Sequence, residues 1–238
     1  MKTSKPLSVL LSVLTAVLMV AGSVAVPLLC RPFYYAHIHS MGMVNYTGLH
    51  ESQIRQAYDH MMDYCLGLRP DFSAGDLIWS EEGASHFADV RSLFLLDLWV
   101  LGISLVLLAA LFVWCRKKQV RPYCFHNRGP GFWAAVGLAL TFLAVGGLAA
   151  LDFDRAFVVF HSIFFPGKTN WLFDWRVDPI ILLLPQDFFR NCALLIFFLL
   201  ILWSMILIAA DLWAAKVREK RMQPPSCGGG CSGCSGCQ

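Results

Sequence analysis

Four apolar stretches constrain the fold of this chain more than any other feature of its sequence. Each approaches or exceeds the roughly 20 residues that a helix needs to cross the hydrocarbon core of a bilayer. A helix also satisfies its own backbone hydrogen bonds in lipid. The chain is 57% hydrophobic and 15% charged, which is far from the balance of a soluble domain. The sequence therefore predicts an all-α membrane protein with four transmembrane helices and a small outer cap of helices and loops. The predicted spans are Leu7–Leu29, Leu93–Cys115, Phe132–Leu151 and Phe188–Trp213.

Lysine and arginine concentrate on one side of such a four-span chain. They precede the first span, and they recur in the loop 116–131 and in the tail 214–238. Because cytoplasmic loops carry an excess of these residues, both termini are expected in the cytoplasm and the segments 30–92 and 152–187 on the outer side. Acidic residues outnumber basic ones in both outer segments, so the net charge of +3 reflects topology. It does not indicate a nucleic-acid partner.

The first apolar stretch has two interpretations. Lys2 and Lys5 precede it and small residues lie near its end, as in a cleavable signal peptide. Its apolar run is too long for a typical signal peptide. We therefore expect a retained anchor.

The first outer segment is predicted to contain one amphipathic helix over about residues 50–66, where apolar residues recur at helical spacing before Gly67. This helix either packs onto the membrane-embedded helices or lies along the bilayer surface, although its polar face is acidic rather than basic. Residues 67–83 are rich in Gly, Pro, Asp and Ser and predict a loop. A helix from Ala84 onward is expected to run directly into the second span.

Two histidines lie where chemistry at the membrane surface requires them. His86 precedes the second span, and if residues 84–97 are helical, His86, Asp89 and Asp97 share one stripe. Asp89 is then able to orient the His86 ring. His161 lies among phenylalanines in a predicted short helix, where desolvation favours a neutral imidazole that accepts a proton. The alternative is that both rings rest at the headgroup level as interfacial residues.

Further charged residues are candidates for supporting roles. Asp97 lies inside the second span, where a charge is costly, so it has either a functional partner or a wetted position at the helix end. Asp174, Arg176 and Asp178 lie in the aromatic-rich stretch 171–181. That stretch is either an aromatic belt at the interface or an active-site loop whose charges orient a catalytic group or a headgroup.

Familiar soluble-enzyme motifs are absent from the sequence. It has no serine elbow, phosphate loop, paired-histidine zinc helix or kinase motif, which leaves histidine-based acyl or proton transfer. The tail carries cysteines at spacings that suit a soft metal ion, but it offers no folded scaffold, so we expect a reduced tail without metal. These cysteines are Cys227, Cys231, Cys234 and Cys237.

Several motifs together resemble one family. They are His86-x-x-Asp89-Val90-Arg91, Phe160-His161-x-x-Phe164-Phe165, Trp171-Leu172-Phe173-Asp174, Asp178-Pro179-Ile180-Ile181 and Leu184-Pro185-x-x-Phe188-Phe189. This pattern is similar to that of the bacterial lipoprotein intramolecular transacylases, the Lit family.

The resemblance implies a specific reaction and site. Members move the sn-2 acyl chain of a lipoprotein's diacylglyceryl-cysteine onto the α-amino group of the same cysteine, which leaves a lyso-form lipoprotein. His86 and His161 match the family's two essential histidines at the outer face of the bacterial cytoplasmic membrane. Diacylated lipoproteins and membrane lipid are the implied partners, and no metal or cofactor is implied. Which histidine acts as base and which as proton donor stays open.

Two other functions are compatible with the residues. One is a non-enzymatic membrane scaffold or accessory subunit that binds a partner through its outer loops. The other is a metal- or haem-binding membrane protein with His86 and His161 as ligands, although no third ligand lies at a suitable spacing.

Overall fold

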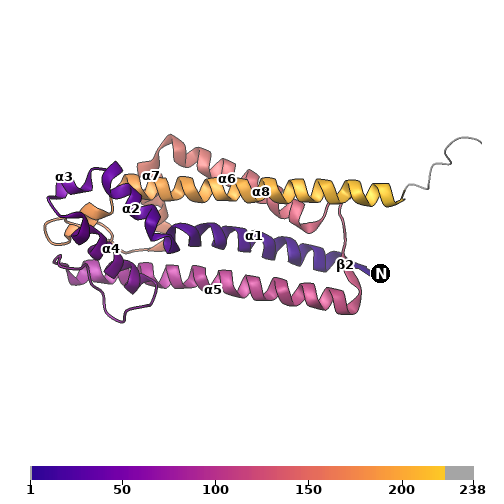
Figure 1. Cartoon of the computed structure of the whole chain (residues 1–238), viewed down its shortest axis with the longest axis horizontal. Coiled ribbons are helices and arrows are strands. Elements are labelled where there is room, and N and C mark those ends of the chain that lie inside the picture. The colour runs from indigo at the N-terminus through magenta and orange to yellow at the C-terminus, as the bar shows by residue number, and fades with distance from the viewer. Residues whose placement is uncertain (1, 223–238) are drawn as a thin grey trace, which may run out of the picture.

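A bundle of long helices forms the body of the protein. The computed structural model describes residues 2–222, and the four tail cysteines Cys227, Cys231, Cys234 and Cys237 lie outside the described residues. Within residues 2–222, four helices are long and apolar enough to cross a membrane, and they run side by side along the long axis of the molecule (Figure 1). They are α1 (Lys5–Leu29), α5 (Glu81–Lys118), α6 (Pro130–Leu151) and α8 (Gln186–Met222). The prediction of four transmembrane helices is confirmed.

The bundle presents apolar side chains outward. Trp99, Val106 and Leu148 are 69%, 68% and 71% exposed, an arrangement that suits hydrocarbon around the helices rather than water. Helix α1 packs against α5, α6 and α8, so the first apolar stretch is an integral part of the bundle.

The chain folds back on itself at the end of the bundle that holds residue 2. Strand β1 (Lys2–Ser4) pairs in parallel with β2 (Val120–Pro122), which follows α5. The Ser8 hydroxyl donates to the backbone oxygen of Tyr123 over 2.8 Å. These contacts tie the basic loop after α5 to the start of α1.

Short helices gather at the opposite end of the bundle and form a cap (Figure 1). They are α2 (Arg31–Ser40), α3 (Met43–Thr47), α4 (Glu51–Cys65) and the 3₁₀ helix η1 (Pro179–Leu183). The predicted helix over residues 50–66 is therefore present as α4. Helices α2 and α3 were not predicted, because residues 31–47 show no clear apolar period.

The cap has its own buried core. Tyr34, Ile38 and Ile54 are fully buried, and the rings of Tyr34 and Tyr58 stack with centroids 3.6 Å apart. The Tyr34 hydroxyl donates to the backbone oxygen of Leu183, 149 residues later in the chain, over 2.8 Å. The apolar face of α4 is thus buried inside the protein and does not lie on the bilayer surface.

The acidic face of α4 has an internal partner. The guanidinium of Arg31 pairs with Asp59 at 3.1 Å and also with Asp63. Because one arginine between two carboxylates joins α2 to α4, the acidic character of this face reflects packing within the cap.

The two helices that carry the candidate histidines both begin at side-chain caps. The Ser80 hydroxyl accepts from the Gly83 amide at 2.9 Å, so α5 starts at Glu81, three residues earlier than predicted. Helix α7 (Phe153–Phe164) starts where the Asp152 carboxylate accepts from the Arg155 amide at 2.9 Å. The first three turns of α5 precede its apolar, membrane-crossing part.

Candidate active site

His86 of α5 and His161 of α7 meet at the cap end of the bundle. Their ring centroids are 6.0 Å apart and the ring planes differ by 29°. The two residues are only 6% and 7% exposed. The structure therefore brings the two candidate histidines together, although they lie 75 residues apart in the chain.

The environment of His161 defines its protonation. Its Nδ1 lies 2.8 Å from the backbone oxygen of Phe157. Because a carbonyl oxygen only accepts, Nδ1 carries the proton and the lone pair of neutral His161 lies on Nε2. The rings of Trp171 and Phe157 flank the imidazole, with centroids 4.5 Å and 4.3 Å from it. His161 is thus held in one tautomer with its basic nitrogen free.

His86 lies among aromatic rings with less polar contact. The centroids of Phe165 and Phe173 are 5.0 Å and 5.4 Å from its ring. Its Nδ1 is buried and has no hydrogen-bond partner in the part of the chain that the structure describes. A buried polar nitrogen without a partner is costly in a folded protein, so such an atom points to a bound group that would satisfy it.

Burial keeps both rings neutral. It lowers the pKa of His161 below the ordinary 6.5, although the hydrogen bond to Phe157 opposes the shift. Burial also lowers the pKa of His86, to about 4, the neighbouring His161 adds to that shift, and Asp89 opposes it. Neutral imidazoles at neutral pH can accept protons in a reaction.

An apolar hollow of about 430 Å³ opens beside the two imidazoles. Its walls come from the cap-side ends of α1, α5 and α8 together with α4, α7 and η1, and His86, His161, Trp171 and Phe188 are among the lining residues. This volume is typical of a small-molecule site. The lining is almost entirely hydrocarbon and aromatic, so the hollow suits an acyl chain.

Asp89 does not orient His86 as predicted. Its carboxylate instead accepts from Lys168 Nζ at 2.5 Å and from Asn170 Nδ2 at 3.3 Å. The helical stripe placed Asp89 near His86 correctly, but the loop after α7 supplies stronger partners on the same side. Asp89 therefore joins α5 to the segment that leads from His161 to Trp171.

Asp178 acts at the start of α5. It is 5% exposed, and its two carboxylate oxygens accept from the Ser80 amide and the Ser80 hydroxyl, each at 2.7 Å. Ser80 in turn caps the helix that carries His86. Asp178 therefore holds the residue that caps this helix, and it does not line the apolar hollow.

The other three predicted supporting residues do not line the hollow beside the histidines. Asp97 follows His86 by eleven residues on α5, about 16 Å along the helix axis, and its Oδ2 is buried without a partner among residues 2–222. Asp174 accepts from the Arg176 amide at 3.0 Å within an exposed turn. The Arg176 guanidinium lies over the ring of Trp175. These contacts stabilise the loop locally.

Sequence reasoning missed several residues of the site. The Phe157 carbonyl, Lys168, Asn170 and Ser80 were not singled out, and Trp171 was noted only as part of an aromatic stretch and of one family motif. The i−4 position of Phe157 relative to His161 was the available signal, because a helical histidine often donates to that carbonyl. The contacts across segments had no sequence signal.

The described residues contain no cluster of three or more His, Cys, Asp or Glu side chains that could hold a metal ion. His86 and His161 approach each other without a third ligand of this kind.

Comparison with known proteins identifies the family. The family model described as lipoprotein intramolecular transacylase Lit matches residues 9–189. The solved structure of Lit from Bacillus cereus superposes with a TM-score of 0.78 at 22% identity and covers 91% of this chain and 97% of that chain. Two histidine mutants of the same protein, to arginine and to alanine, have TM-scores of 0.73 and 0.74 at 21% identity. They cover 91% of this chain and 92% and 94% of their own chains.

The structural likeness shows a shared fold, and the family match covers most of the chain. A search of curated protein sequences finds no match. The family match over residues 9–189 contains both histidines and most residues that line the hollow beside them. This chain therefore belongs to the Lit family of lipoprotein intramolecular transacylases and is a membrane-integral acyltransferase.

Proposed function

We propose that the protein moves the sn-2 acyl chain of a diacylglyceryl-cysteine lipoprotein onto the α-amino group of that cysteine, with His86 and His161 as the catalytic residues. The geometry of His161 supports the proposal most directly. Its Nδ1–H is held by the Phe157 carbonyl, so Nε2 is free to take a proton beside the mouth of an apolar hollow. Such an imidazole suits the general base of an acyl transfer.

The proposed step conserves atoms and protons. The neutral amine attacks the ester carbonyl, an amide C–N bond forms, and the bond from the acyl carbon to the sn-2 oxygen breaks. His161 Nε2 takes the proton that the amine sheds. That proton then passes by way of His86 to the departing sn-2 oxygen, so both imidazoles end the step neutral. Since nucleophile and ester belong to one molecule, the protein contributes mainly orientation.

We place the site at the outer face of the bacterial cytoplasmic membrane with both termini in the cytoplasm. Basic residues cluster at the end of the bundle opposite the histidines, which supports this orientation. They include Arg116, Lys117, Lys118, Arg121, Arg128, Lys216, Arg218 and Lys220.

The test is expression of the gene in a bacterium that lacks this conversion, followed by analysis of a lipoprotein N-terminus. Because the transfer is intramolecular, substrate and product have the same mass, so fragmentation must locate the chains. We expect one acyl chain on the cysteine nitrogen, one on the glyceryl group, and an N-terminus blocked to amine reagents. A free amine and two glyceryl-bound chains would contradict the proposal.

The pH dependence of conversion should reflect the lowered pKa values of the histidines. Below the α-amine pKa of about 7.7–8.0, the rate should fall about tenfold per pH unit, because the amine is protonated. Protonation of the histidines adds a further loss only below pH 6.5, since burial lowers the pKa of both rings. Rates with a diacyl lipopeptide between pH 5 and 8 test this, and a fall of more than about tenfold per pH unit at or above pH 6.5 would contradict it.

The tail should be dispensable for conversion. The family match ends at residue 189, and we place the histidines across the bilayer from the C-terminal end of α8. Truncation after Met222 should therefore leave the extent of conversion unchanged at equal membrane levels of protein. Loss of conversion in a normally inserted truncation would show that the tail takes part.

A further inference from the structure

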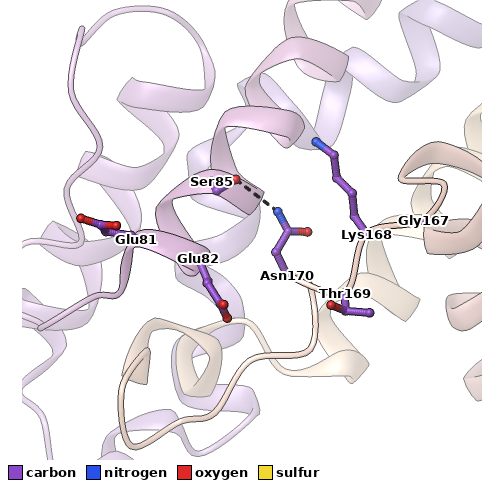
Figure 2. Close-up of a pocket in the computed structure, with 7 residues that line it drawn as sticks. All are labelled: Glu81, Glu82, Ser85, Gly167, Lys168, Thr169 and Asn170. Carbon is purple, nitrogen blue, oxygen red and sulfur yellow. Dashed lines mark hydrogen bonds between the residues drawn. The ribbon is translucent and has the colours of Figure 1, made fainter.

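A polar cleft of about 450 Å³ lies next to the apolar hollow. One wall is the first turn and a half of α5, and the other is the loop that follows α7 (Figure 2). It is lined by Glu81, Glu82, Ser85, Gly167, Lys168, Thr169 and Asn170. The hollow beside it is almost wholly apolar, so the two cavities offer contrasting environments.

Consecutive residues divide the cleft from the hollow. Ser85 lines the cleft and His86 lines the hollow, and in the same way Asn170 lines the cleft and Trp171 the hollow. The Asn170 amide donates to the Ser85 hydroxyl over 3.4 Å, as the dashed line in Figure 2 shows. Each wall thus passes from the cleft to the hollow within one residue. A molecule that reacts at the histidines therefore lies next to the cleft.

Two glutamates and one lysine are among the residues that line the cleft. The lysine, Lys168, pairs with Asp89, which leaves the glutamates as the excess charge. Glu81 and Glu82 are exposed, and neither forms an ion pair with the residues that the structure describes. Their position in the first turn of α5 is favourable for the helix dipole, which is the competing structural explanation for them.

The cleft also contains an unused hydrogen-bond acceptor. Asn170 Oδ1 is buried, and no described residue donates to it. Across the boundary, His86 Nδ1 is also buried and has no partner among the described residues. Buried polar atoms without partners on both sides of one boundary indicate that a polar ligand crosses it.

We propose that this cleft binds the first residues of the lipoprotein polypeptide after the acylated cysteine and favours lysine or arginine there. The inference rests on the proposed function. The cysteine carries acyl chains, an α-amine and a polypeptide. With the chains in the hollow and the amine at the histidines, the polypeptide leaves through the neighbouring polar cavity, where its N–H groups match Asn170 Oδ1.

The spacing along α5 predicts which residues of the bound peptide lie near the glutamates. Glu82 and Glu81 precede His86 by four and five residues, about 6 to 7.5 Å along the helix axis. An extended peptide advances about 3.3–3.6 Å per residue. The second residue after the cysteine, about 7 Å along an extended chain, is therefore level with these carboxylates, and the third lies about 3 Å beyond them.

The experiment uses lipopeptides that differ only in charge at those two positions, with Lys-Lys, Gln-Gln or Glu-Glu. Diether versions, which cannot transfer an acyl chain, measure Kd on the full-length protein in nanodiscs of zwitterionic lipid. Diester versions measure conversion on the same samples. The test variant carries Glu81→Gln and Glu82→Gln together. The control variant is Asp71→Asn, which changes an exposed carboxylate outside the cleft.

For the wild-type protein we expect the diether Lys-Lys peptide to bind more tightly than the Gln-Gln peptide, by about 1.5- to 5-fold per charge at low salt. The Glu-Glu peptide should bind most weakly, and the differences should shrink at high salt. The ratio of Kd values should approach one in the double variant and remain at the wild-type value in Asp71→Asn.

Equal binding of the three diether peptides by the wild-type protein would overturn the inference, and so would an unchanged ratio in the double variant. A purely structural role of Glu81 and Glu82 would weaken all three peptides alike. Failure of the wild-type protein to convert any diester peptide contradicts the proposed function itself, so the two failures are distinguishable.

Discussion

Replacement of His86 or of His161 by alanine is expected to abolish the lyso-form product at normal membrane levels of protein. The amine must lose a proton and the departing sn-2 oxygen must gain one, and a positioned acid or base contributes about 10²- to 10⁴-fold to each transfer. His161→Asn should be equally inactive. Its amide can still donate to the Phe157 carbonyl, but it offers no basic nitrogen.

A third histidine of the outer cap provides the matched control. His60 lies on α4 with its Nδ1 3.3 Å from the Ser73 hydroxyl and does not line the hollow. His60→Ala should therefore retain conversion. The measurement is fragmentation of a lipoprotein N-terminus beside immunoblots of each variant. Substantial product from His86→Ala or His161→Ala would rule out the two-histidine mechanism, and loss of protein without loss of activity per molecule would indicate a packing role.

Gly83→Ala is expected to cause the second large loss of conversion, although a glycine has no side chain that could touch an imidazole. A Cβ at position 83 would lie 2.8 Å from the carboxyl carbon of Asp178 and closer still to one of its oxygens. Asp178 is buried and bound to Ser80, so it cannot simply move aside. Overpacking of this kind costs about 1–3 kcal/mol, and a displacement of about 1 Å at a site can cost about 10²-fold in rate.

Gly102→Ala on the same helix separates this clash from a general effect of losing a glycine. A Cβ at Gly102 meets nothing within 4 Å, and alanine is better than glycine inside a helix by about 0.5–1 kcal/mol. Gly102→Ala should therefore retain conversion and unfold at the same or a higher temperature. Initial rates and thermal midpoints of purified protein give both comparisons. Wild-type rates in Gly83→Ala would show that the Ser80–Asp178 contact does not position His86.

The membrane-spanning helices were predictable because each is a long apolar run, and hydrocarbon permits few other backbone structures. Helix α4 was also predictable, since its buried residues repeat with a helical period. Helices α2 and α3 were not, because residues such as Tyr34 and Ile38 are buried by distant partners in η1 and α8. Their burial depends on the tertiary structure and has no local pattern.

The candidate site was likewise predictable only where it depends on local sequence. The approach of His86 and His161 was predicted from two local motifs, of which one lies near the start of α5 and the other in the last turn of α7. The partner of Asp89 was predicted wrongly, because a helical stripe specifies direction but not competition from Lys168 in another segment. Asp178 was selected for its place in an aromatic loop, yet its role depends on Ser80, 98 residues earlier in the chain.

The core of the cap joins the beginning and the end of the chain, which has a consequence for biosynthesis. Tyr34 packs against Phe188 and donates to the carbonyl of Leu183, so α2 cannot complete its packing until the ribosome has made about 150 further residues. At about 5–20 residues per second, that interval lasts about 7 to 30 seconds. His86 is made about a third of the way through this interval and His161 near its end, but the wall that Phe188 and its neighbours contribute to the hollow comes last. The hollow is therefore incomplete until the first turns of α8 have been made.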